Sequence, residues 1–342
     1  MYYCFISSRR IATFSRGDRA AQGELVDAWR YPVTVAPDAP VLAGLQTEQA
    51  RPELAELDSW STEDIVALMA ADARRASAAV EAAKATVARA VEEITARMAE
   101  GGRLVYVGAG TAGRLGMLDA AEAGPTFSVP DGTVLGLMAG GVSAFGAARE
   151  NAEDDTDAGA RALDECGIRP IDTVVGISAS GRTPFVLGAV KRANEIGALS
   201  VGISCNVWTP LSGAAQIPID LAVGPEIVAG STRLNAGTAQ KLVLNAISTT
   251  VMIRLGKTYG PLMVDLRATN AKLRTRAIRI VTTVTGAEPA AAEEALRSCG
   301  WSAKLACLVL MRSLAPGDAA ALLERHKGAL RQALAASDNS PS

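Results

Sequence analysis

Two glutamates are the residues of this chain best suited to acid–base chemistry. Glu122 follows a glycine-rich segment, Gly108–Gly113, and Glu153 lies in an acidic run between residues 150 and 157. Two carboxylates can divide general acid and general base work on one substrate. Each also has a plainer interpretation as an exposed helix residue, and for Glu153 the spacing alone favours that interpretation. The residues by themselves do not say which reaction such a pair would catalyse.

A turn rich in hydroxyl groups is a second candidate site. Ser178, Ser180 and Thr183 lie within six positions, beside Gly181 and directly before a proline. The N-terminus of a helix offers free N–H groups, and clustered hydroxyls can bind a phosphate without adding charge. One hydroxyl would be enough for ordinary helix capping. Three of them favour a phosphate site.

The glycine-rich segment follows a short apolar strand, Leu104–Val107, and runs directly into a predicted helix. Its Gly-x-Gly-x-x-Gly spacing is also found in dinucleotide-binding proteins, where an acidic residue ends the next strand. Here the next strand ends in Met138–Gly140, without an acid. The sequence therefore predicts a phosphorylated small molecule as ligand, and no nucleotide cofactor.

Strands and helices alternate along the middle of the chain, which is typical of a doubly wound α/β fold. We predict a mainly parallel, five-stranded sheet flanked by helices, with ligands at the carboxyl ends of the strands. The predicted strands are 104–107, 134–138, 173–177, 199–204 and 219–223. The predicted helices are one or two within 61–100, followed by about 144–166, 184–196 and 240–255.

The chain divides into four predicted parts. Residues 1–44 mix arginines, serines and prolines without periodicity and are expected to form a disordered extension. The α/β domain with its N-terminal helices spans 45–264. A small all-helical module spans 265–336, with an arginine-rich helix at 266–284 and three short helices starting near Pro289, Ser302 and Pro316. Residues 337–342 are a polar tail.

Composition excludes several classes of protein. The net charge of -2 predicts no nucleic acid partner, and no apolar run reaches the length of a membrane-spanning helix. Five cysteines without a pairing pattern indicate a reduced, cytoplasmic protein. The single histidine, His326, argues against a His-based metal site and a Ser-His-Asp triad. We therefore expect no metal and no cofactor.

Several long motifs, in order from about Leu45 to the C-terminus, resemble the N-acetylmuramic acid 6-phosphate etherases. This family has the sugar isomerase (SIS) fold and is related to the glucokinase regulatory proteins. The motifs are Gly108–Pro125, Ile177–Pro184, Val201–Asn206, Val223–Lys241 and Leu262–Leu273.

The resemblance implies a lyase that cleaves the lactyl ether of N-acetylmuramic acid 6-phosphate, giving N-acetylglucosamine 6-phosphate and D-lactate. It implies that Glu122 is the proton donor and that Glu153 is the second catalytic glutamate. Phosphate binding is carried over to the turn Ser178–Thr183, and contacts with the substrate to Gly110 and Thr111. Sites of this fold usually border a second subunit, so a homodimer is expected.

Four positions depart from the family's pattern. Ala112 and Ala121 stand where the family commonly has serine, Arg51 where it has asparagine, and Asn235 where it has lysine. The loss of a hydroxyl and of a cation predicts a lower affinity or an altered sugar preference. Two alternatives to the etherase stay open at this point. One is a sugar-phosphate isomerase, and the other is a regulatory protein that binds a sugar phosphate without turnover.

Overall fold

The structure, a computed structural model, describes residues 44–146, 149, 151–266 and 268–336. The predicted extension at 1–44, apart from its last residue, and the predicted tail at 337–342 lie outside the described residues.

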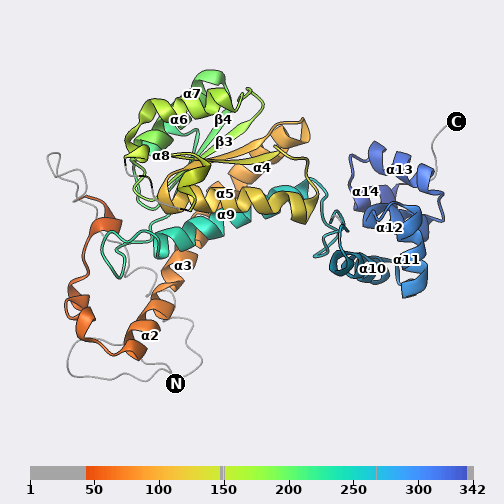
Figure 1. Ribbon diagram of the computed structural model, residues 1–342, viewed down its shortest axis with the longest axis horizontal. Coiled ribbons are helices and arrows are strands. Elements are labelled where there is room, and N and C mark those ends of the chain that lie inside the picture. The colour runs from red at the N-terminus through yellow and green to blue at the C-terminus, as the bar shows by residue number, and fades with distance from the viewer. Residues whose placement is uncertain (1–43, 147–148, 150, 267, 337–342) are drawn as a thin grey trace. The chain divides into compact units, whose positions relative to one another are not determined.

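A five-stranded sheet forms the centre of the α/β part (Figure 1). Its strands lie in the order β2-β1-β3-β4-β5, and every neighbouring pair is parallel. The strands are β1 (Leu104–Gly108), β2 (Val134–Met138), β3 (Thr173–Ser178), β4 (Leu199–Ser204) and β5 (Ile217–Asp220). The predicted parallel sheet is confirmed, although β5 begins two residues before its expected start at Ile219.

Helices cover both faces of this sheet, as expected of a doubly wound fold (Figure 1). Side chains of β1 alternate between the faces: Leu104 and Tyr106 pack on one side, Val105 and Val107 on the other. The first face carries α3 (Arg74–Ala82), α4 (Lys84–Ala99), α5 (Gly110–Phe127) and α9 (Asn235–Arg254). The second carries α6 (Thr156–Glu165), α7 (Pro184–Ile196) and α8 (Pro210–Ala214).

The N-terminal helical stretch is more divided than its sequence predicts. Three short 3-10 turns come first: η1 (Gln46–Glu48), η2 (Pro52–Leu54) and η3 (Leu57–Ser59). Ser61 then caps α2 (Thr62–Asp72) by accepting a hydrogen bond from the backbone of Asp64. Breaks at Ala73 and Ala83 separate α2, α3 and α4. Neither break has a glycine or proline to mark it, which explains why one or two helices were expected.

The helix expected at about 144–166 is wrong in its first half. Two 3-10 turns, η4 (Val142–Ala144) and η5 (Ala152–Asp154), precede the short helix α6. The carboxylate of Asp155 accepts the backbone N–H of Ala158 at 2.8 Å and so fixes the start of α6. Glu153 therefore lies before the helix, not within it.

The C-terminal part is all helical, as predicted, but has one more helix. It consists of α10 (Ala271–Thr285), α11 (Pro289–Ser298), α12 (Ala303–Arg312), α13 (Pro316–Arg325) and α14 (Leu330–Ala335). The sequence did not indicate α14. Buried residues of these helices, such as Ile280, Leu296 and Leu308, form a cluster distinct from the two clusters at the sheet. The first buried residue of this cluster is Val264, and the boundary near residue 264 stays a prediction.

No helix of the described ranges is by itself long and apolar enough to cross a membrane. The consecutive helices α12 and α13 reach that length and composition only together, and they are bent by 108° at their junction.

Candidate active site

Two of the predicted site segments leave the sheet side by side. In the parallel register, Gly108 at the end of β1 pairs with Ile177 near the end of β3. Gly110 and Thr111 therefore follow β1 at the edge of the sheet where Ser178 ends the neighbouring strand β3. Thr111 also lies against the start of α9: a β-carbon added to Gly237 of that helix would be 3.3 Å from the methyl carbon of Thr111. The helix starts of α5 and α9 thus meet at the carboxyl edge of the sheet, beside that of α7.

The glycines of the Gly108–Gly113 segment serve mainly to pack α5 on β1. A β-carbon at Gly108 would lie 2.6 Å from the backbone nitrogen of Gly113, and one at Gly113 would lie 2.8 Å from the carbonyl oxygen of Gly108. Gly110 has a φ of +53° and open space around it. A side chain is therefore excluded at Gly108 and Gly113 by contact, and disfavoured at Gly110 by backbone conformation.

The three hydroxyls of the Ser178–Thr183 turn form one connected group. The Ser178 hydroxyl lies 2.8 Å from that of Thr183 and 3.3 Å from that of Ser180. It also accepts the backbone N–H of Gly181 at 3.0 Å, while the Ser180 hydroxyl accepts the N–H of Arg182 at 3.2 Å. Thr183 makes no capping bond to α7. The structure thus brings the predicted phosphate ligands together.

The loop after β4 supports this turn from outside. Asn206 donates to the carbonyl of Ala179 at 3.0 Å, and the N–H of Leu211 donates to the carbonyl of Gly181 at 3.0 Å. A β-carbon at Gly181, whose φ is +66°, would clash with the side chain of Thr209. Only glycine fits at this position. The contact with Thr209 could not be predicted from the sequence, because Gly181 follows β3 and Thr209 follows β4.

Glu122 lies far along α5 from the turns just described. It is exposed, and it comes twelve residues after Gly110, which begins the helix. At 1.5 Å per residue that is about 18 Å of helix, longer than a hexose phosphate. The structure does not bring Glu122 to the start of the Gly108–Gly113 segment (the glycine turn) or to the Ser178–Thr183 turn (the hydroxyl turn) of its own chain.

Asp119, one turn before Glu122, is held firmly. Its carboxylate accepts hydrogen bonds from the Tyr106 hydroxyl at 2.8 Å and from the Ser248 hydroxyl at 3.1 Å. Burial raises the pKa of Asp119 above its usual value, against the effect of these two hydrogen bonds. Because these partners come from β1 and α9, they fix the helix face on which Glu122 also lies. Sequence reasoning did not assign a role to Asp119.

Glu153 lies in η5, on the segment between β2 and α6. It is exposed, and the turn that carries it packs against α7 on the second face of the sheet. Glu122 is carried by α5 on the first face. The two glutamates predicted to act together therefore belong to opposite helical layers, and no hydrogen bond or ion pair among the described residues links them.

A buried glutamate, Glu226, holds the start of α9. It is fully buried and accepts the backbone N–H groups of Asn235 at 3.0 Å and Ala236 at 2.9 Å. A carboxylate at a helix N-terminus is favoured by the free N–H groups and the helix dipole. Burial raises the pKa of Glu226, against the effect of these two bonds. Glu226 thus fixes the helix start that contacts Thr111.

A further carboxylate, Glu48, lies beside the loops of the site. Its neighbour Thr47 is fully buried, and the amide of Asn206 donates to the Thr47 hydroxyl at 3.1 Å. Asn206 is the residue that also bonds to Ala179 of the hydroxyl turn. A β-carbon at Gly230 would lie 2.8 Å from a Glu48 carboxylate oxygen. Sequence analysis did not assign a role to Glu48.

Within the part of the chain that the structure describes, no three His, Cys, Asp or Glu side chains gather as a metal ion would require. The described site consists instead of hydroxyls, backbone N–H groups and separate carboxylates.

Comparison with known proteins gives a consistent result. The family model of the glucokinase regulatory protein N-terminal SIS domain matches residues 86–194. An N-acetylmuramic acid 6-phosphate etherase of Rubrobacter xylanophilus is 54% identical over 293 residues, which cover 86% of this chain and 97% of that protein. Another, of Streptomyces avermitilis, is 52% identical over 295 residues, covering 86% and 95%.

Among solved structures, a phosphoheptose isomerase from Francisella tularensis aligns with 57% of this chain and 99% of its own, at 16% identity and a TM-score of 0.45. We draw nothing from a likeness of this degree. The similarity to the two etherases, by contrast, runs through most of this chain and nearly all of theirs. The protein therefore belongs to the N-acetylmuramic acid 6-phosphate etherase family.

Proposed function

We propose that this protein is an N-acetylmuramic acid 6-phosphate etherase, a carbon–oxygen lyase of cell-wall amino sugar recycling. The observation that carries the proposal is the 54% identity to an etherase over 97% of that protein's length. Both glutamates of the family's motifs are present, as Glu122 and Glu153. A catalytic role for them gives a reason for their presence that a binding-only regulatory protein would lack.

The reaction needs one base, one acid and a held phosphate. In the open-chain aldehyde the carbonyl acidifies the C2 proton, which a carboxylate removes. The C3–O bond then breaks, its electrons leave with the lactate oxygen, and a C2=C3 double bond forms. Glu122 protonates that oxygen as general acid, and Glu153 is the second carboxylate. Water finally adds its hydroxyl at C3 and a proton at C2.

The phosphate is assigned to the Ser178–Thr183 turn. Its three hydroxyls are connected and lie at the start of α7, where backbone N–H groups are free of helix partners. Gly110 and Thr111 are assigned to substrate contacts because their strand pairs with the one that precedes the turn. Hydroxyl ligands suit a phosphate that must be released after each turnover, since they add no opposite charge.

We further propose that the protein acts as a homodimer in which Glu122 serves the partner's turn. Within one chain, α5 carries Glu122 about 18 Å beyond its first residue, Gly110. A second copy related by a twofold axis could present its own Glu122 to this turn, and the reverse contact would follow by symmetry. We place the protein in the reducing cytoplasm, which fits the free thiols of Cys166, Cys205, Cys299 and Cys307.

The first test is release of D-lactate from N-acetylmuramic acid 6-phosphate. The wild type should release lactate, and Glu122→Gln should abolish turnover while the variant still binds N-acetylglucosamine 6-phosphate. Glu165→Gln, which changes an exposed glutamate at the end of α6, is the matched control and should stay active. Conversion of a hexose phosphate from aldose to ketose without lactate would favour the isomerase. Tight binding without any turnover would favour the regulatory protein.

The second test asks which subunit supplies Glu122. Glu122→Gln and Thr183→Val chains, each inactive or impaired alone, are co-expressed and purified together. If Glu122 serves the partner's turn, half of the dimers are mixed and one of their two sites is intact, so activity returns to about a quarter of the wild type. If Glu122 serves its own chain's turn, no intact site forms and activity does not return.

A further inference from the structure

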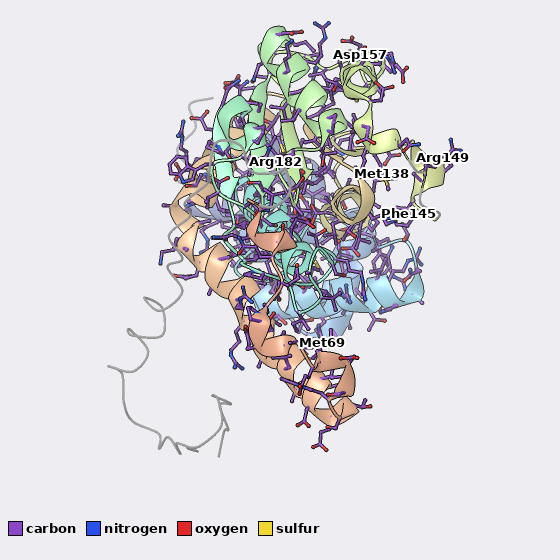
Figure 2. The ribbon with its side chains drawn as sticks, turned by 90° about the vertical axis from the view of Figure 1, so that its left-hand side faces the viewer. Met69, Met138, Phe145, Arg149, Asp157 and Arg182 are labelled. Atoms are coloured by element: carbon purple, nitrogen blue, oxygen red, sulfur yellow. The ribbon has the colours of Figure 1, made fainter. Side chains whose placement is uncertain are left out.

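One arginine at the hydroxyl turn stands without a partner. Arg182 lies between Gly181 and Thr183, and its backbone N–H donates to the Ser180 hydroxyl. Its side chain is half-buried, and its Nε atom is buried without any hydrogen-bond partner. Figure 2 labels Arg182 near the centre of a view that also labels Met138, the last residue of β2.

Other partly buried arginines of the α/β part are held by protein groups. Arg51 pairs with Asp72, Arg103 pairs with Asp172, and Arg114 donates to the carbonyls of Ala144 and Phe145. Among the described residues, no carboxylate lies within ion-pair distance of Arg182. A guanidinium whose donors are partly removed from water and unpaired is unfavourable by itself. Its position next to the phosphate turn indicates that a ligand supplies the missing acceptor.

The substrate of the proposed function carries two anions, a phosphate and the carboxylate of the lactyl group. The phosphate already has three hydroxyls and the free N–H groups of α7 at the turn. A planar carboxylate is matched best by the planar, two-pronged donor face of a guanidinium. Arg182 offers that face at the end of a long side chain, so it can reach past the phosphate towards a second charge on the same molecule.

We propose that Arg182 is a specificity-determining residue that binds the lactyl carboxylate of the substrate. The proposal rests on the proposed function and goes beyond it, because it assigns the second anion of the substrate to a named side chain. Arg182 then separates substrate from product. Both carry the phosphate, but only the substrate carries the carboxylate, so the sugar product loses this contact when the ether is cleaved.

The test compares two ligands that differ in the carboxylate. Binding of N-acetylmuramic acid 6-phosphate and of N-acetylglucosamine 6-phosphate is measured by calorimetry, on a Glu122→Gln background that prevents turnover. Arg182→Met should weaken binding of the first ligand by about a hundredfold and of the second by less than about threefold. Arg182→Lys, which keeps the charge but loses the two-pronged face, should give an intermediate loss for the first ligand only.

A ligand variant provides an independent arm. In N-acetylmuramic acid 6-phosphate methyl ester the lactyl carboxylate is neutral. The protein with Arg182 should bind the ester about a hundredfold more weakly than the acid. The Arg182→Met protein should bind the ester and the acid with equal affinity. Arg192→Met serves as the matched control, because Arg192 lies on α7, the helix that follows Arg182, but pairs with Asp164 and Glu195 at the surface. It should change neither affinity.

Three outcomes would overturn the proposal. Equal weakening of both sugar phosphates by Arg182→Met would make Arg182 a phosphate ligand. Unchanged binding of both would leave it without a role at the ligand. Equal weakening together with a lower melting temperature would make it structural. A wild type that binds the acid more tightly than the ester but releases no lactate would refute the etherase and retain the carboxylate site.

Discussion

The hydroxyl turn allows affinity and stability to be separated by single substitutions. Thr183→Val removes one hydroxyl and keeps the shape of the side chain. Thr183 makes no capping bond, so the change removes only its bond to the Ser178 hydroxyl and should cost no more than about 1 kcal/mol of stability. Ser178→Ala removes a hydroxyl that also accepts the N–H of Gly181, so it should in addition cost about 1 kcal/mol of stability.

The expected loss of affinity follows from the number of bonds removed. A hydrogen bond to a charged group contributes about 1.5–3 kcal/mol, which is roughly a 10- to 150-fold change in a dissociation constant. Thr183→Val should therefore raise the dissociation constant for N-acetylglucosamine 6-phosphate by that factor. The same loss should hold for inorganic phosphate, because the proposal assigns the hydroxyls to the phosphate alone.

Calorimetric titration and thermal unfolding of both variants would test this reasoning. Ser204→Ala is the matched control: this serine ends β4, is buried, and its hydroxyl bonds to Asn206 and Asp220 and not to the turn. It should lower the melting temperature without changing the affinity for phosphate. Wild-type affinity in Thr183→Val, together with wild-type stability, would show that the turn is an ordinary helix start.

Three further predictions concern stability. Burial would raise the pKa of Asp172, but hydrogen bonds from two arginines outweigh it and lower the pKa from 3.8 to about 2. Asp172 therefore contributes roughly 2 kcal/mol to the free energy of unfolding above pH 5, and this contribution is lost as the pH falls through 4 to 2. In urea unfolding at pH 7 and pH 3, Asp172→Asn should lack this pH-dependent loss of stability, and a pH dependence equal to that of the wild type would contradict the assignment. Trp208 is 90% exposed and has a φ of +56°, a backbone conformation that favours glycine, so Trp208→Gly should raise the free energy of unfolding by about 0.5–1 kcal/mol. Trp301 has a similar φ of +65°, but its ring packs under the guanidinium of Arg274, so Trp301→Gly should lower the free energy of unfolding. Glu226→Gln should cost about 1–2 kcal/mol on thermal unfolding and raise KM, because the start of α9 is no longer held beside the site by a full charge; an unchanged KM would restrict Glu226 to stability.

The sheet and the hydroxyl turn could be predicted because their signals are local. The apolar runs at 104–107 and 173–177 each end in small or hydroxyl residues, so strand, turn and helix follow one another within a few positions. The breaks at Ala73 and Ala83 could not be predicted, since alanine is the best helix former and nothing in the sequence interrupts the pattern. The two helices that follow the breaks, α3 and α4, both pack on α9, which lies far from them in the sequence.

The position of Glu122 shows a second limit of sequence reasoning. Its motif lies close to the glycine turn in the sequence, which suggested that the two lie close in space. A continuous helix instead separates them, although Gly116 and Gly124 lie within it and Pro125 follows near its end. Gly116 is there for packing, because a β-carbon would lie 2.9 Å from that of Tyr106. The length of this helix cannot be derived from the spacing of the motif.

The departures at Arg51 and Asn235 have a common structural explanation. Both side chains bind the same buried carboxylate: Arg51 pairs with Asp72 at 2.8 Å, and Asn235 donates to its other oxygen at 2.5 Å. Where the family commonly has asparagine and lysine, this chain has arginine and asparagine, and Asp72 also pairs with Arg75 at 3.1 Å. The missing lysine therefore need not mean a missing cation beside α9. In this chain the charge beside Asp72 comes from Arg51 and Arg75 of the N-terminal segment and not from the helix α9.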